Sequence, residues 1–81
     1  MKYYILKPKS VAVDEQLLAG IRESDRDAEF VDVIDDCDIA VAQKGWTRSK
    51  TAVMEWRWQT EMHRSCREGS IYLDRCAVHL D

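Results

Sequence analysis

A chain of 81 residues, 46% hydrophobic and 33% charged, has the composition of one compact domain, near the lower size limit for burying a core without metals or disulfides. Its formal net charge of −3 argues against general nucleic-acid binding. No apolar run is long enough for a membrane span or for the core of a signal peptide. We therefore expect one cytoplasmic domain over residues 1–81.

The expected elements begin with a central strand over Lys2–Leu6, an apolar and β-favouring run that ends before Pro8. Asp14 is placed to cap a helix that continues to about Ser24, because leucine and isoleucine residues then recur on one helical face. The following residues, up to Asp27, are polar and indicate a loop.

Residues 28–36 fit two patterns. Phe30 and Ile34 have the spacing of a helical face, whereas Val31 and Val33 alternate as in a strand. We favour a short helix, mainly because the family resemblance described below places one before the next strand. That strand is Ile39–Ala42, an apolar run of the kind buried in parallel sheets.

A long helix is expected from about Ser49 to Arg67, with its core face formed by Met54, Trp58 and Met62 at successive i+4 positions. Gly69 would then end this helix. Residues 71–73 return to β character, and residues 76–80 extend that strand or add an edge strand. The order β, α, (α), β, α, β predicts a small α/β domain, Rossmann-like or flavodoxin-like, with a mostly parallel sheet flanked by helices.

Candidate metal ligands are sparse. Cys37, Cys66 and Cys76 are an odd set without Cys-x-x-Cys spacing, so we expect reduced apolar side chains and no zinc site or disulfide framework. His63 falls on the Glu55 side of the expected helix, but no further ligands accompany this pair. The sequence predicts neither a metal nor another cofactor.

The stretch from the Ile39–Ala42 strand into the long helix carries a motif. It resembles a small bacterial and phage family related to nucleoside 2-deoxyribosyltransferases, in which the run is usually Pro-Gly-Trp-x-x-Ser-x-Gly-Ala-x-x-Glu. The matching positions are Gly45, Trp46, Ser49, Ala52 and Glu55. Lys44 replaces the proline and Thr51 replaces the second glycine. The resemblance extends over roughly residues 34–62.

This resemblance implies a nucleoside- or nucleotide-handling domain in which Glu55 is the nucleophile of glycosyl transfer or N-glycosidic hydrolysis. We expect the Glu55 carboxylate to face the loop of residues 45–49. The substrate-binding residues implied are Gly45, Trp46, Ser49, Lys50 and Thr51. From the residues alone, Glu55 steadies the first turns of a helix, Ser49 caps it and Trp46 packs over its start.

The alternative is a non-catalytic phage or mobile-element protein that binds a host protein through an acidic or tryptophan-bearing surface. Acidic residues gather over residues 14–38 and basic ones over residues 44–67. Trp56 and Trp58 are two positions apart on the expected helix, so one sheet cannot cover both indoles. We expect Trp58 in the core, and whichever of the two indoles does not enter the core is left for a homodimer or partner contact. The sequence leaves open whether the chain is an enzyme.

Overall fold

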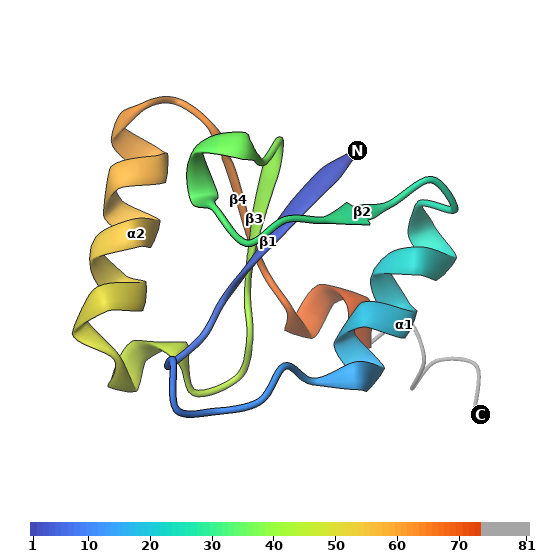
Figure 1. Cartoon of the computed structure of the whole chain (residues 1–81), viewed down its shortest axis with the longest axis horizontal. Helices are drawn as coiled ribbons and strands as arrows, with labels where there is room; N and C mark the ends of the chain where they lie inside the picture. The colour runs from blue at the N-terminus through green and yellow to red at the C-terminus, as the bar shows by residue number, and fades with distance from the viewer. Residues whose placement is uncertain (74–81) are drawn as a thin grey trace.

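The structure, a computed structural model, describes residues 1–73 and alternates strands with helices (Figure 1). The elements are β1 (Lys2–Leu6), α1 (Glu15–Ser24), β2 (Glu29–Phe30), the 3₁₀ turn η1 (Ile34–Asp36), β3 (Ile39–Ala42), the 3₁₀ turn η2 (Trp46–Arg48), α2 (Lys50–Glu61) and β4 (Ser65–Glu68). Residues 70–73 begin a further helical segment. None of the helices within residues 1–73 has the length and apolar content needed to cross a membrane.

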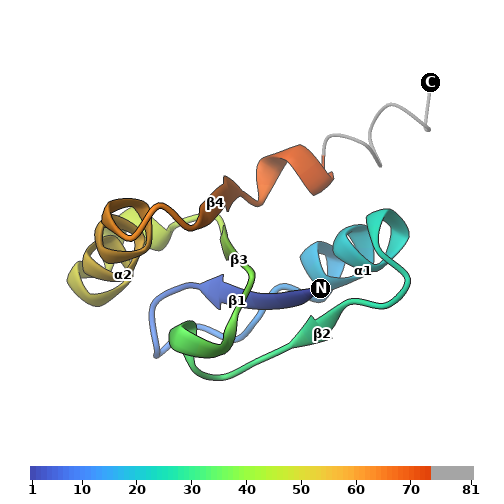
Figure 2. The same ribbon diagram turned by 90° about the horizontal axis from the view of Figure 1, so that it is seen from above.

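The strands form one parallel sheet in the order β2-β1-β3-β4. This is the start of the flavodoxin-like order, in which the chain first builds to one side of β1 and then to the other. Both views place α1 and α2 on opposite sides of the sheet (Figures 1 and 2). The expected Rossmann-like α/β architecture with a parallel sheet flanked by helices is confirmed.

Alternation along the strands divides the core into two clusters, one on each face of the sheet. The α1 face contains Tyr3, Leu17, Ile21, Ile39, Val41 and Tyr72. The α2 face contains Leu6, Cys37, Ala40 and Ala42, with the half-buried rings of Tyr4, Trp46 and Trp56 packed against them. Small side chains on the α2 face leave room for large aromatic and polar groups above the sheet.

Both predicted helix caps are present. The Asp14 side chain accepts a hydrogen bond from the backbone N–H of Gln16 at 2.9 Å, and Ser49 Oγ accepts one from the backbone N–H of Ala52 at 3.2 Å. The strands Lys2–Leu6 and Ile39–Ala42 also lie where they were predicted.

The long helix is shorter than predicted. It ends at Glu61, and Ser65–Glu68 forms β4 beside β3 instead of continuing the helix. Between them His63 has φ 58°, a left-handed conformation that reverses the chain. The polar segment 65–68 has little strand character of its own, so pairing with the open edge of β3 overrides local propensity. Gly69 follows this strand rather than ending a helix.

The predicted core stripe of α2 is wrong by one residue. Met54 is 69% exposed and Met62 53%, while the buried line runs through Ala52 and Gln59, both 0% exposed. One position along a helix is a rotation of about 100°. Trp58 is consequently half-buried at the side of the helix, with the Arg64 guanidinium 5.3 Å from its ring centroid. It is Trp56 that packs against the core.

Two further segments differ from expectation. The sequence favours one short helix over residues 28–36. The structure instead has the two-residue strand β2 followed by the 3₁₀ turn η1. Residues 71–73 are helical rather than β. The strand predicted for residues 76–80 and the expectation for Cys76 lie outside the described residues.

Candidate functional site

The crevice at the carboxyl ends of β1 and β3 is where a sheet of this order changes direction and where ligands usually bind. Here Gln43 follows β3 directly and is only 5% exposed. Its Oε1 accepts from the backbone N–H of Asp14 at 2.8 Å, and its Nε2 donates to the backbone oxygen of Ala12 at 3.1 Å. The amide of Gln43 thus ties the β1–α1 loop to the end of β3.

Glu55 lies within the first two turns of α2, as predicted, and is half-buried. Its Oε2 accepts a hydrogen bond from the Tyr4 hydroxyl at 2.7 Å. The partner therefore comes from β1 and not from the loop of residues 45–49, which corrects the expected orientation of the carboxylate. Beside it is a pocket of about 440 Å³ lined by Ile34, Thr51, Met54, Glu55 and Trp58.

Tyr4 is held in its neutral form. Burial, followed by the hydrogen bond to Glu55 and the negative charge of that carboxylate, raises the pKa of Tyr4 well above the ordinary value of 10.0. The hydroxyl therefore keeps its proton and stays a donor to Glu55. Within residues 1–73 Glu55 forms no ion pair.

The loop after β3 is shaped by Gly45, which has φ 88°, a left-handed conformation that favours glycine. The next residue, Trp46, stacks on Trp56 with ring centroids 4.7 Å apart and an interplanar angle of 27°. This contact is the packing role that residue type alone favours for Trp46. Gly45 and Trp46 both line a second pocket, of about 420 Å³, at the ends of β3 and β4.

The structure divides the predicted site between these two pockets. Gly45 and Trp46 line the pocket at the strand ends, whereas Thr51 and Glu55 line the pocket beside α2. Ser49 caps α2, and Lys50 is exposed at its first position. The division arises because the side chains of Glu55 and Trp56 point about 100° apart around α2. They lie on opposite sides of the buried stripe formed by Ala52 and Gln59.

Two residues of this region escaped prediction. Tyr4 is hidden in the apolar run of the first strand, although strand alternation alone shows that Tyr3 and Tyr4 face opposite sides of the sheet. Gln43 follows the apolar run Ile39–Ala42, and its position at the carboxyl end of a parallel strand was the available signal.

Cys37 and Cys66 are free thiols, and burial raises the pKa of both above the ordinary value. Neither is activated as a nucleophile. No group of three or more His, Cys, Asp or Glu residues in the described part of the chain is arranged to hold a metal ion. Glu55 and His63, which share one side of the longer helix expected from the sequence, do not share a helix face here, because α2 ends before His63.

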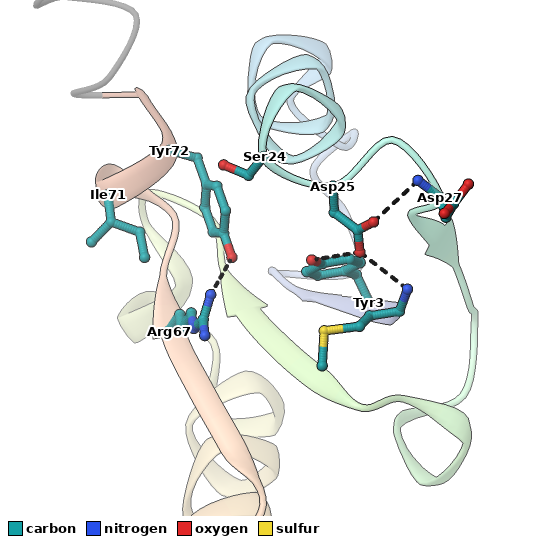
Figure 3. A pocket seen from close by; sticks show the side chains of 8 residues that line it. Tyr3, Ser24, Asp25, Asp27, Arg67, Ile71 and Tyr72 are labelled. Atoms are coloured by element: carbon teal, nitrogen blue, oxygen red, sulfur yellow. Dashed lines mark hydrogen bonds and ion pairs between the residues drawn. The ribbon is translucent and has the colours of Figure 1, made fainter.

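A third pocket, of about 540 Å³, lies on the other face of the sheet between α1 and β4 (Figure 3). Asp25 Oδ2 accepts hydrogen bonds there from the Met1 amino group at 3.0 Å and from the Tyr3 hydroxyl at 3.1 Å. Burial and this bond raise the pKa of Tyr3 to about 12. Across the pocket, Arg67 Nη1 donates to the Tyr72 hydroxyl oxygen at 3.3 Å.

Comparisons with protein-family models, with curated proteins and with solved structures find no match for this chain. The resemblance of residues 34–62 to the nucleoside 2-deoxyribosyltransferase relatives stays a prediction. Function is inferred below from the residues of the sites and their geometry.

Proposed function

We propose that this chain is a nucleoside- or nucleotide-handling domain in which Glu55 carries out glycosyl transfer or N-glycosidic hydrolysis. The observation that favours it most is the 2.7 Å hydrogen bond from the Tyr4 hydroxyl to Glu55 Oε2. The carboxylate lies at a pocket whose other residues include Ile34, Met54 and Trp58. A carboxylate held by one neutral donor beside apolar side chains has the properties of an activated nucleophile.

The surroundings preserve the reactivity of this carboxylate. Among residues 1–73 Glu55 has no cationic partner that would neutralise it. Tyr4 fixes one oxygen and leaves Oε1 without a hydrogen bond among the described residues. The apolar neighbours lower the local polarity, which strengthens electrostatic attraction between Glu55 and a developing positive charge on a sugar ring.

The chemistry follows retaining glycosyl transfer. Glu55 Oε1 attacks the anomeric carbon and forms an ester, while the bond from that carbon to the base breaks and its electron pair leaves with the base. Tyr4 orients Glu55 and does not protonate the base, because its pKa is raised. The base takes its proton from solvent. Water then cleaves the ester in hydrolysis, or a second base does so in transfer.

The test is release of free base from a panel of nucleosides and nucleoside 5′-monophosphates at high protein concentration, followed by chromatography. Glu55→Gln keeps the shape of the side chain and should reduce the rate by at least about 100-fold. Tyr4→Phe should reduce it about tenfold, since it removes only the orienting bond. Glu61→Gln, at an exposed glutamate of the same helix, is the matched control and should behave as the wild type.

Failure of the wild type to release base from any of these substrates would overturn the proposal. So would an active protein in which Glu55→Gln matches Glu61→Gln.

We also propose a second function, self-association or partner binding through the side of α2 that bears Met54, Trp58 and Met62. It is favoured by the exposure of the two methionines, with Met54 69% and Met62 53% accessible, and by Ile34, which lines one pocket with Met54 and Trp58. The indole left for an interface is thus Trp58 rather than Trp56. Burial of 100 Å² of such surface stabilises a contact by about 2.5 kcal/mol.

Met54→Glu should abolish association in sedimentation experiments without unfolding the chain, because this side chain contributes nothing to the core. Arg57→Gln, at another exposed position of α2, is the control. A wild type that sediments as a monomer at all accessible concentrations would remove self-association through this surface.

A further inference from the structure

The pocket between α1 and β4 is separate from Glu55, because it lies on the opposite face of the sheet (Figure 3). Its volume of about 540 Å³ falls inside the range of small-molecule sites, about 300–1,000 Å³. Tyr3 and Tyr72 are each 3% exposed, so two fixed aromatic residues line the space. Nothing in the proposed chemistry of Glu55 uses this pocket.

One wall carries hydrogen-bond donors that have no acceptor among residues 1–73. Arg67 Nη1 donates to the Tyr72 hydroxyl oxygen at 3.3 Å, which leaves the hydroxyl proton of Tyr72 to be donated elsewhere. An arginine side chain has five N–H donors, and within residues 1–73 Arg67 has no other hydrogen bond and no ion pair. This wall matches a planar carboxylate, which accepts from guanidinium and hydroxyl donors together.

The opposite wall is acidic. Asp25 is already engaged by the Met1 amino group and the Tyr3 hydroxyl, whereas the Asp27 carboxylate has no partner among the described residues. Figure 3 shows Arg67 and Tyr72 on one side of the pocket and Asp25 and Asp27 on the other. Because the Met1 amino group already offsets the charge of Asp25, the Asp27 carboxylate is the one left to attract an ammonium group and to repel a multiply charged anion such as phosphate.

We propose that this pocket binds a small zwitterion of the α-amino acid class. Its carboxylate pairs with the Arg67 guanidinium and the Tyr72 hydroxyl, and its ammonium group faces the Asp27 carboxylate. Its apolar side chain lies among Tyr3, Tyr72 and Ile71, which also line the space. The charges of such a ligand mirror the separation of charge between the two walls.

The experiment is a titration of the full 81-residue chain, isotopically labelled for amide NMR, with L-leucine as the probe. N-acetyl-L-leucine lacks the ammonium charge and L-leucinamide lacks the carboxylate. Both should bind at least about tenfold more weakly than leucine, the loss that accompanies one charged hydrogen bond. The saturable shifts with leucine should include the amides of residues 67 and 72.

Variants distinguish a built site from a solvated surface arginine. Arg67→Gln should weaken leucine binding at least about tenfold, and Tyr72→Phe about threefold, because a neutral hydrogen bond contributes less than a charged one. Arg57→Gln removes an exposed guanidinium from the other face and should leave leucine binding unchanged. Tyr72→Phe keeps the ring and also the backbone and Cβ atoms that lie against Gly20, so it tests the hydroxyl without disturbing the core.

Absence of saturable binding up to about 50 mM leucine, where a site with a millimolar Kd would be filled, overturns the proposal. Three other results would also overturn it. They are equal binding of leucinamide, tighter binding of inorganic phosphate, and a folded Arg67→Gln variant that binds leucine as the wild type does. Base release by Glu55 is measured separately and does not depend on any of these outcomes.

Discussion

The two faces of the sheet are filled in different ways. On the α1 face, Leu17, Ile21, Ile39 and Val41 are at most 2% exposed and pack as interlocking aliphatic side chains. On the α2 face, the strands contribute mainly small residues, and above them lie half-buried tryptophans, a tyrosine hydroxyl, a carboxylate and a buried amide. The aliphatic core of the α1 face therefore supplies stability, and the polar groups of that face line the pocket that contains Tyr3, Arg67 and Tyr72. On the α2 face, by contrast, polar groups are part of the packing itself.

The largest expected effect is on the α1 face. Ile21→Ala removes a side chain that is 0% exposed and leaves a cavity under α1, which should lower the free energy of unfolding by about 2–5 kcal/mol. Urea titration followed by circular dichroism measures it. Gln16→Ala, at an exposed position of the same helix, should change stability by less than about 0.5 kcal/mol. A loss below about 1 kcal/mol at Ile21 would mean that this face is not the stabilising one.

A smaller effect of opposite sign is expected on the α2 face. Gln59 is fully buried, and its Oε1 has no hydrogen-bond partner within residues 1–73. Its Nε2 is 3.5 Å from Cys37 Sγ and 3.5 Å from the Ser65 backbone oxygen, the latter a long distance for a bond to oxygen. Gln59→Leu keeps the volume and removes the unpaired oxygen, so it should raise the free energy of unfolding by about 1 kcal/mol. Gln59→Ala is the control and should destabilise by creating a cavity. Clear destabilisation by leucine would show that the amide is satisfied.

The smallest effects concern adjacent tyrosines on opposite faces. The pKa of Tyr3 is raised to about 12 and that of Tyr4 is raised further above the ordinary 10.0, in both cases first by burial. The folded protein therefore holds these protons more tightly than the unfolded chain does. Stability should be intact below the unfolded pKa of about 10 and fall as the pH rises above it.

Unfolding measured between about pH 9 and pH 12 should show this decline, and both Tyr3→Phe and Tyr4→Phe should flatten it. Tyrosinate absorbance should confirm that two of the three tyrosines ionise late or only on unfolding. A decline that neither substitution alters would assign the alkaline transition to other groups.

The sequence predicted what depends on nearest neighbours. Strands β1 and β3, the cap at Asp14 and the cap at Ser49 follow from short-range patterns and are found as expected. The sequence did not predict features that depend on tertiary contacts, such as which face of α2 is buried. The apolar spacing of Met54 and Trp58 is as strong as that of the buried positions, and only the sheet below determines which line of the helix faces inward.

Strand β4 shows the same limit more sharply. Its residues, Ser65–Glu68, are polar and continue a helical pattern, so only the unpaired edge of β3 could identify them as a strand. For the candidate site, the place of Glu55 near the helix start was predictable. Its partner was not, because Tyr4 is remote in sequence and joins Glu55 only when β1 lies under α2.

The side chain of Gln43 fills the crevice at the carboxyl end of β3. By accepting from the Asp14 N–H and donating to the Ala12 carbonyl, the amide satisfies backbone groups that a bound molecule would otherwise contact. The Gln43 side chain thus takes the position that a bound small molecule occupies in other proteins with this strand order. Any molecule entering there must compete with a side chain whose effective concentration is set by the fold.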